Sequence, residues 1–313
     1  MTKTHNARSP ILVTGVPRSG TTWLARLLAE APGMALTGRE PMNPRGRQYA
    51  LAGTLKGWAM LTDPNRRQAR ALRMSYKGRT PLVFSRYGHR QWAALLPRTR
   101  FVVKDPFAML SMPLVHEITG ASPVLLFRHP GAVLTSYRRM GWTPDVEELD
   151  PIVTQFTALY GHQPGIMPAP EGANDVSLMA WFWNILNGIA LFDADRLGTN
   201  VTVLSHEDVA VRGQSFVSEL FHHLGIAWQE RVTEELEWSG TSAPVDDSAL
   251  HNFDRNPAKV AHEWKTKVTA YERDQLEKQT QEVLQMLRER TFCSQADSDL
   301  DLTDDESYPN RRR

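Results

Sequence analysis

A loop bounded by two glycines carries the clearest chemical pattern in this sequence. Gly15 and Gly20 enclose the residues Val-Pro-Arg-Ser, at the spacing of a phosphate-binding loop. The loop follows a short apolar run and precedes a helical pattern, so its backbone amides and the helix dipole predict an anion site. Thr21 stands where nucleoside triphosphatases carry lysine, and we expect Arg18 to supply the cation instead. A tight turn in which the glycines only relieve steric strain is the alternative.

A second pair of residues has the chemistry to bind a phosphate. Arg128 ends an apolar run, and Ser136 follows eight residues later in the helical pattern RHPGAVLTS. We expect both side chains on one wall of a crevice. Taken alone, an arginine at a strand end is a common surface residue, and a serine within a helix most often bonds its own backbone. The pair therefore indicates phosphate binding only in combination with the glycine-bounded loop.

The elements that position these residues are legible in the hydrophobic pattern. Short apolar runs alternate with helical patterns, which predicts an α/β, P-loop-like fold of three layers, with a mostly parallel central sheet between helices. Ligands bind beyond the carboxyl ends of such strands, so the polar residues after each run should meet at one crevice. The predicted strands span residues 11–15, 34–38, 101–104, 124–128 and 201–205, and the predicted helices span 21–30, 130–140 and a segment opened by the capping-box pattern Thr269–Glu272.

Other segments lack this regularity. We expect residues 1–293 to form a single domain, with irregular insertions near 45–100 and 141–178 that build substrate walls. Residues 294–313 hold six acids and few apolar side chains, which predicts a disordered acidic tail.

The two phosphate motifs together resemble those of the PAPS-dependent sulfotransferase superfamily. PRSGTTW (17–23) resembles its 5′-phosphosulfate loop, and Arg128 with Ser136 resembles its 3′-phosphate motif. The resemblance implies transfer of a sulfuryl group from 3′-phosphoadenosine 5′-phosphosulfate (PAPS) to a hydroxyl, leaving adenosine 3′,5′-bisphosphate. It implies cofactor binding by Arg18, Ser19, Gly20, Thr21, Thr22, Trp23, Arg128 and Ser136, with Arg255 and Lys259 in a segment that resembles the one folded over the nucleotide. For Trp23 a core position is the alternative, and for Arg255 and Lys259 a solvated basic turn is.

Three strand-end tripeptides extend the resemblance. REP (39–41) resembles the tripeptide at this place in carbohydrate sulfotransferases, and KDP (104–106) resembles the residues that end the family's third strand. In HED (206–208), His206 stands where the family usually has tyrosine. The likeness is strongest to soluble bacterial sulfotransferases of carbohydrates and small metabolites. A THLP-like histidine, the base of cytosolic members, is absent after the third run.

Sulfuryl transfer needs in-line positioning, charge stabilisation and a base for the acceptor proton. Glu40 is the leading base, because the second predicted strand is expected beside the first and its end then faces the loop. A salt bridge to Arg39 or Arg45 is the alternative role for Glu40. Lys104 is a candidate for added positive charge near the transferred group, with a solvated strand end as its alternative. Asp105 and His129 are reserve candidates for the base.

Composition narrows the classes of partner. The net charge of +1 argues against broad capture of nucleic acid, and we expect a small-molecule hydroxyl acceptor as the partner. Cys293 is the only cysteine, which excludes an internal disulfide and favours a cytoplasmic location. No secretory signal is visible, and no stretch is expected to approach the length that spans a bilayer. The adjacent His222 and His223 point in different directions on a helix, so no metal site is expected.

Two other functions stay open. A P-loop kinase of small molecules would require ATP and magnesium, and the predicted 3′-phosphate motif has no counterpart in ATP. A nucleotide-binding protein without catalysis is the second alternative. The sequence leaves the acceptor and the oligomeric state undetermined.

Overall fold

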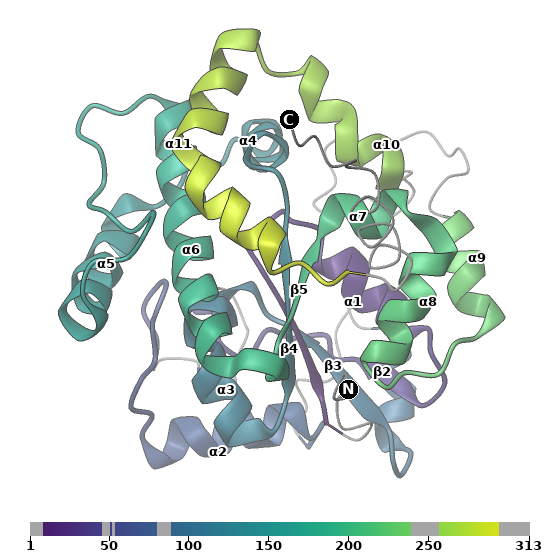
Figure 1. Cartoon of the computed structure of the whole chain (residues 1–313). Helices are drawn as coiled ribbons and strands as arrows, with labels where there is room; N and C mark the ends of the chain where they lie inside the picture. Colours follow the sequence, from purple (N-terminus) through teal and green to yellow (C-terminus); the bar gives the residue numbers. More distant parts are fainter. Residues whose placement is uncertain (1–8, 46–50, 52–53, 80–88, 239–256, 294–313) are drawn as a thin grey trace, which may run out of the picture.

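A sheet of five parallel strands forms the centre of the protein, in the order β2-β3-β1-β4-β5 (Figure 1). The computed structural model describes residues 9–45, 51, 54–79, 89–238 and 257–293. All five predicted strands are present, with ends within two residues of the prediction, and the α/β class is confirmed. The strands are β1 (Ile11–Thr14), β2 (Met34–Leu36), β3 (Arg100–Lys104), β4 (Ser122–Phe127) and β5 (Thr202–Ser205).

Helices cover both faces of this sheet, and the strands are accordingly buried on both faces. Leu12 faces a core built with α3 (Met112–Thr119), α4 (Pro130–Met140), α6 (Asp175–Leu197) and α11 (Ala270–Glu289). Its neighbour Val13 faces the opposite core, against α1 (Thr21–Ala29), α8 (Gly213–His223) and α9 (Glu230–Trp238). The two sets of helices lie on opposite sides of the strands in Figure 1. The predicted three-layer arrangement is confirmed.

The strand order corrects one expectation that concerned Glu40. The second strand was expected beside the first, but β2 pairs with β3, and β3 pairs with β1. The crossover that contains α2 (Arg66–Tyr76) returns the chain through β3, which fills the position next to β1. Glu40 therefore approaches the phosphate loop from beyond β3 and not from an adjacent strand.

Helix α6 is the central core helix. Trp181 and Trp183 are buried in it, as predicted, and Trp183 is fully inaccessible to solvent. Within the described ranges, one stretch, Asp175–Asn200, is long and apolar enough to cross a membrane, with a mean hydropathy of 1.2. The expectation that no stretch approaches that length is therefore wrong. The fold buries 78% of that window, as is usual for the core helix of a globular domain.

Two segments with irregular sequence patterns each contain a helix. In the stretch 45–100, α2 begins at a capping box formed by Asn65 and Gln68. In the stretch 141–178, α5 (Val146–Tyr160) begins at Asp145, whose side chain accepts a hydrogen bond from the Glu148 amide. The division into one domain with insertions stays a prediction.

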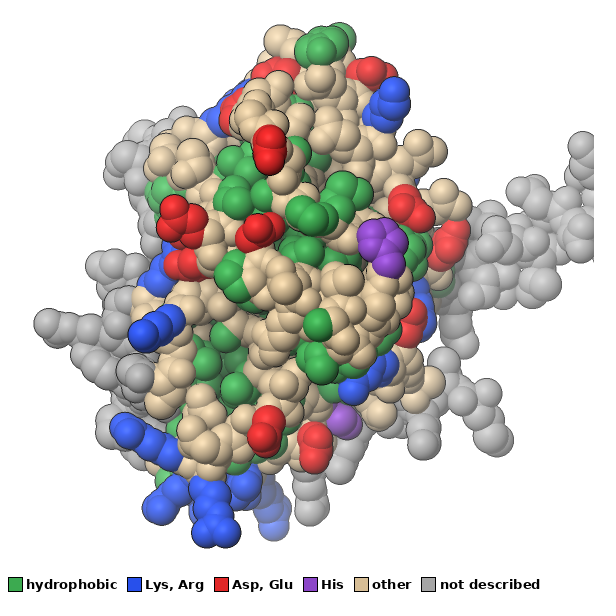
Figure 2. Space-filling model, turned by 90° about the vertical axis from the view of Figure 1, so that its left-hand side faces the viewer, with side chains coloured by type: hydrophobic (Ala, Val, Ile, Leu, Met, Phe, Trp, Pro, Cys, Tyr) green, Lys and Arg blue, Asp and Glu red, His purple; other side chains and the backbone are tan. Residues whose placement is uncertain are grey.

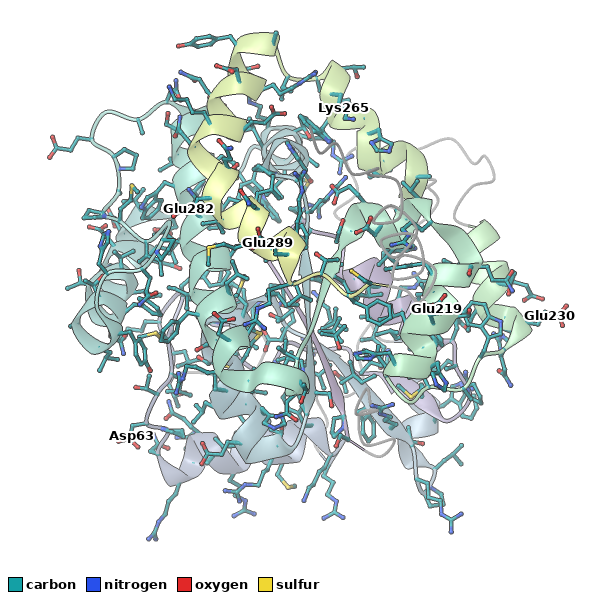
Figure 3. The ribbon with its side chains drawn as sticks, in the orientation of Figure 1. Asp63, Glu219, Glu230, Lys265, Glu282 and Glu289 are labelled. Atoms are coloured by element: carbon teal, nitrogen blue, oxygen red, sulfur yellow. The ribbon has the colours of Figure 1, made fainter. Side chains whose placement is uncertain are left out.

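The last helix, α11, confirms the predicted capping box, because Thr269 and Glu272 exchange side-chain and backbone hydrogen bonds. Leu276, Val283, Leu284 and Leu287 are buried, as expected, and the exposed face carries Glu282 and Glu289 (Figure 3). The chain then reaches Cys293, an exposed free thiol. The acidic segment 294–313 lies outside the described residues.

Candidate active site

The phosphate loop connects β1 to α1 through three residues with positive φ. Gly15 has φ 151°, and a Cβ there would lie 2.1 Å from the carbonyl oxygen of Leu126 on β4. Gly20 has φ 92°, and a Cβ would lie 2.4 Å from the His206 ring. Arg18 itself has φ 75°, an uncommon conformation for a residue with a side chain. Both glycines are therefore required by close neighbours, and the loop is wrapped tightly at the carboxyl end of the sheet.

The end of the loop is suited to a phosphate. Gly20 is the N-cap of α1 and supplies no side-chain cap, so the first-turn amides are available to an anion. Thr21, Thr22 and Trp23 of the first turn line the adjacent cavity, whereas Ser19 is fully buried behind the loop. Ser19 Oγ and Trp23 Nε1 are buried polar atoms without a hydrogen-bond partner. An unpartnered buried polar atom is costly unless a ligand bonds it, and Trp23, which lines the cavity, fits a nucleotide in this way whereas Ser19 does not reach the cavity.

The two predicted phosphate motifs meet in space. Arg18 Nε donates a hydrogen bond to Ser136 Oγ on α4 at 2.9 Å. Arg128, directly after β4, donates to the carbonyl oxygens of Arg18 at 3.2 Å and Val260 at 2.8 Å. The backbone of Arg128 is fixed in turn, because its own carbonyl accepts a 2.9 Å bond from Trp183 Nε1 on α6. The structure thus brings Arg18, Arg128 and Ser136 together on one wall, as predicted.

His129, one of the reserve bases, has a structural position instead. Its Nδ1 accepts a hydrogen bond from the Gly131 amide at the start of α4, and its ring stacks on Trp264 with centroids 4.0 Å apart. Burial lowers the pKa of His129 to about 4, and nearby arginines and a lysine add to this shift. The ring lines a second cavity, of about 520 Å³, and not the one that holds Arg18. His129 is therefore discarded as the base.

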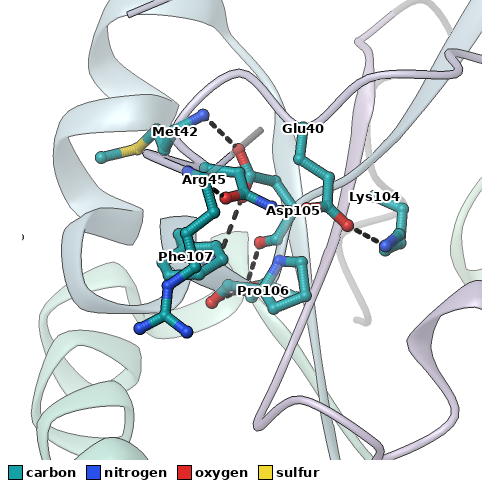
Figure 4. A network of polar contacts seen from close by, with 9 residues as sticks. Glu40, Met42, Arg45, Lys104, Asp105, Pro106 and Phe107 are labelled. Atoms are coloured by element: carbon teal, nitrogen blue, oxygen red, sulfur yellow. Dashed lines mark hydrogen bonds and ion pairs between the residues drawn. The ribbon is translucent and has the colours of Figure 1, made fainter. Parts of the chain in front are cut away.

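Glu40 and Lys104 form an ion pair at the carboxyl ends of β2 and β3 (Figure 4). Their side chains are 15% and 16% exposed. The second carboxylate oxygen of Glu40 accepts a hydrogen bond from Asn43 Nδ2. Arg45, one of the alternative partners of Glu40, pairs with Glu148 at 2.9 Å. Glu40 and Lys104 therefore contact each other in the lining of the cavity that also contains Arg18.

Asp105, the other reserve base, holds the Glu40 segment in place. It is fully buried and accepts hydrogen bonds from the backbone amides of Met42 at 2.6 Å and Phe107 at 3.1 Å (Figure 4). Burial, together with the neighbouring charge of Glu40, raises the pKa of Asp105 to about 8. Asp105 does not line the cavity, so it positions Glu40 and does not contact a substrate.

A cavity of about 690 Å³ unites these groups. Of the predicted residues, it is lined by Arg18, Gly20, Thr21, Thr22, Trp23, Glu40, Lys104, Arg128 and Ser136. Arg255 lies outside the described residues, and Lys259 falls in α10 (Pro257–His262), whose neighbour Trp264 lines the cavity. His206 also lines it, with its ring 5.7 Å from that of Trp23 in an edge-on contact.

Sequence patterns predicted only part of the far wall of this cavity. The wall is lined by Trp58, Phe107, Tyr137, Trp142 and Phe182. The segments 45–100 and 141–178, which were expected to build substrate walls, include Trp58 and Trp142. The other three rings come from the segment after β3, from α4 and from α6, and only the fold brings them together.

Metal ligands do not gather in the part of the chain that the structure describes: no group of three or more His, Cys, Asp or Glu side chains is placed to hold an ion. His223 Nε2 lies 3.0 Å from Thr202 Oγ1, while its neighbour His222 is exposed. His223 therefore contacts the sheet, whereas His222 lies at the surface.

Together the fold and the cavity define a class: a parallel α/β domain with a phosphate loop, a strand-end arginine and a helix serine around one nucleotide-sized cavity. A sequence model described as the sulfotransferase family matches residues 10–230, more than half of the chain. The chain therefore belongs to the sulfotransferase family and is a transferase.

A solved structure with a TM-score above 0.5 supports the fold. The sulfotransferase domain from the curacin biosynthetic pathway is 18% identical, with a TM-score of 0.51, over 90% of this chain and 98% of that domain. Mouse sulfotransferase SULT7A1 complexed with PAP is 13% identical, with a TM-score of 0.41, over 87% of this chain and 83% of that one. STF1 from Mycobacterium tuberculosis is 15% identical, with a TM-score of 0.36, over 84% and 78%. Curated protein sequences gave no match.

Proposed function

We propose that this sulfotransferase takes its sulfuryl group from PAPS and passes it to a hydroxyl of a small molecule, such as a carbohydrate or a glycosylated metabolite. The hydrogen bond between Arg18 and Ser136 carries the proposal. It joins a cation of the 5′-phosphate loop to the residue proposed for the 3′-phosphate, so one ligand with both phosphates would contact both. ATP has no 3′-phosphate, which disfavours a kinase.

The proposed chemistry is a direct in-line displacement. The acceptor oxygen attacks sulfur, a new O–S bond forms, and the bond between sulfur and the bridging phosphate oxygen breaks. The electron pair leaves with adenosine 3′,5′-bisphosphate, and Glu40 takes the acceptor proton. Arg18 and Lys104 supply positive charge where negative charge develops, which supports transfer that is independent of a metal ion.

The donor is tested by comparing thermal stabilisation by adenosine 3′,5′-bisphosphate, adenosine 5′-monophosphate, and ATP with magnesium. We expect the bisphosphate to raise the melting temperature most, because only it contacts both anchors. Ser136→Ala should reduce that gain without changing the effect of the monophosphate. Stabilisation by ATP with magnesium alone would refute the proposed donor.

A further inference from the structure

The cavity has two chemically different ends. Arg128, Ser136 and Trp23 lie at the end next to the phosphate loop, where the nucleotide is proposed to bind. Glu40 and Lys104 lie at the end of β3, and Phe107 follows Lys104 by three residues (Figure 4). The wall beyond Glu40 is thus the one that an acceptor would contact.

This wall is a continuous row of aromatic rings. Trp58 lies 4.3 Å from Phe107 and 6.3 Å from Phe182, measured between ring centroids. Tyr137 continues the row, 5.6 Å from Phe182 and 5.7 Å from Trp142. Three of these distances are within the usual range for ring contacts, about 4.5–7 Å, and the Trp58–Phe107 distance is slightly shorter.

The backbone around these rings is firmly held. The Trp58 amide donates to Glu148 at 3.0 Å, and the Phe107 amide donates to Asp105. Four of the rings are at most 8% exposed, whereas Trp142 is 40% exposed at the mouth. A preformed, rigid apolar wall selects by shape, because little side-chain freedom is lost when a flat group packs on it.

The polar side chains nearest this wall are already engaged with one another. Asn43 bonds Glu40 and also accepts from the Arg45 amide. Arg45 pairs with Asp145 at 3.8 Å and with Glu148. A sugar ring buried here would leave several hydroxyls without partners, which is costly, whereas a single hydroxyl is met by Glu40. These charged side chains are all in ion pairs with one another, so an ionised acceptor finds no unpaired counter-charge among them.

We infer that the acceptor is an uncharged alcohol or phenol with a flat, ring-containing apolar body, which packs on these five rings and presents one hydroxyl to Glu40. The inference rests on the proposed function and narrows it. Oligosaccharides are the competing class, since aromatic rings also stack on sugar faces.

The test is binding of 2-naphthol and of cellobiose to the protein saturated with adenosine 3′,5′-bisphosphate, measured by calorimetry and by saturation-transfer NMR. We expect 2-naphthol to bind at least tenfold more tightly than cellobiose. Tighter or equal binding of cellobiose, or no binding of 2-naphthol, overturns the inference. The proposed function stands in both cases if the bisphosphate still binds, and it fails separately if the bisphosphate does not.

Variants locate the effect. Trp142→Ala removes a half-exposed ring and should leave folding intact, while Trp58→Ala removes a buried ring of the same row. Trp142→Ala should weaken 2-naphthol binding at least fivefold. Because the Arg18 guanidinium lies 5.8 Å from the centre of the Trp142 ring, 2-naphthol is measured at saturating bisphosphate for this variant as well. The control is Trp92→Ala, because Trp92 is 62% exposed and does not line the cavity. Equal 2-naphthol affinity in Trp142→Ala and Trp92→Ala counts against the aromatic wall.

Discussion

Arg18 Nε is hydrogen-bonded to Ser136 Oγ, although the two residues lie 118 positions apart in the chain. One belongs to the loop after β1 and the other to the helix after β4, and these two strands are neighbours in the sheet. The bond makes the two ends of the proposed nucleotide site a single unit, so a change at either residue alters the other.

Ser136→Ala removes the partner of Arg18 and a hydroxyl proposed for the 3′-phosphate. We expect the affinity for adenosine 3′,5′-bisphosphate to fall about 10- to 100-fold, since a hydrogen bond to a charged group contributes about 1.5–3 kcal/mol. The affinity for adenosine 5′-phosphosulfate should change little, as measured by calorimetry. Ser218→Ala on α8 is the control, because Ser218 bonds only its own helix. Equal losses for both ligands contradict the 3′-phosphate assignment.

Arg18→Ala tests stabilisation of the leaving group. We expect kcat to fall about 10²- to 10³-fold, the usual effect of removing one donor to a developing charge. The affinity for the bisphosphate should fall much less, and Arg18→Lys should restore part of kcat. Steady-state kinetics and calorimetry on both variants measure this separation. A loss of affinity as large as the loss of kcat argues against a role in the transition state.

Glu40→Gln keeps the size of the side chain but removes its basicity and its charge. We expect kcat to fall about 10²- to 10⁴-fold while bisphosphate binding is retained. Lys104 complicates the result, since its ion-pair partner is lost as well. The double variant Glu40→Gln with Lys104→Gln separates the two roles in a double-mutant cycle. Recovery of activity in the double variant identifies Glu40 as a structural partner of Lys104. If Glu40 is the base, the double variant stays inactive and Lys104→Gln alone retains more activity than Glu40→Gln.

Asp105 predicts a pH dependence of stability. Its pKa is about 8 in the fold and about 3.9 in the unfolded chain, so the folded state keeps the proton to higher pH. The free energy of unfolding therefore loses this contribution as pH rises from about 4 to about 8. Between pH 5 and pH 8, the melting temperature of the Asp105→Asn variant should therefore shift less than that of the unaltered protein.

The control for this series is Asp63→Asn, which changes an exposed carboxylate before α2 (Figure 3). Its melting curve should shift with pH in parallel with that of the unaltered protein. Parallel behaviour of Asp105→Asn as well shows that Asp105 does not titrate in this range.

Local patterns predicted the sheet and the nucleotide end of the site, because each strand and motif is contiguous in sequence. Arg128 directly follows β4, and Ser136 lies in the second turn of α4, so their spacing is set locally. The strand order was not predictable in this way, because β3 and not β2 lies next to β1. Glu40 lines the cavity, but it follows a strand that is not adjacent to β1.

Among the helices that were not predicted, α2 and α5 have identifiable reasons. The buried face of α2 includes Gln68 and Ser75, so its apolar period is incomplete in the sequence. In α5, Pro151 lies inside the helix and obscured the regular spacing of Leu149, Ile152 and Phe156. The aromatic wall depends on contacts between distant segments, for which a single sequence has no local signal.

The sheet order has a consequence for folding. β1 is made first, yet both of its neighbours, β3 and β4, come from much later in the chain. Such non-local pairing closes long loops and is slow to form. The cavity is lined from Pro17 to Lys267, so partly folded chains lack a complete site. A nucleotide at 100 times its Kd then stabilises the native state by about 2.7 kcal/mol relative to every intermediate that lacks the site, so its binding favours chains that have folded completely.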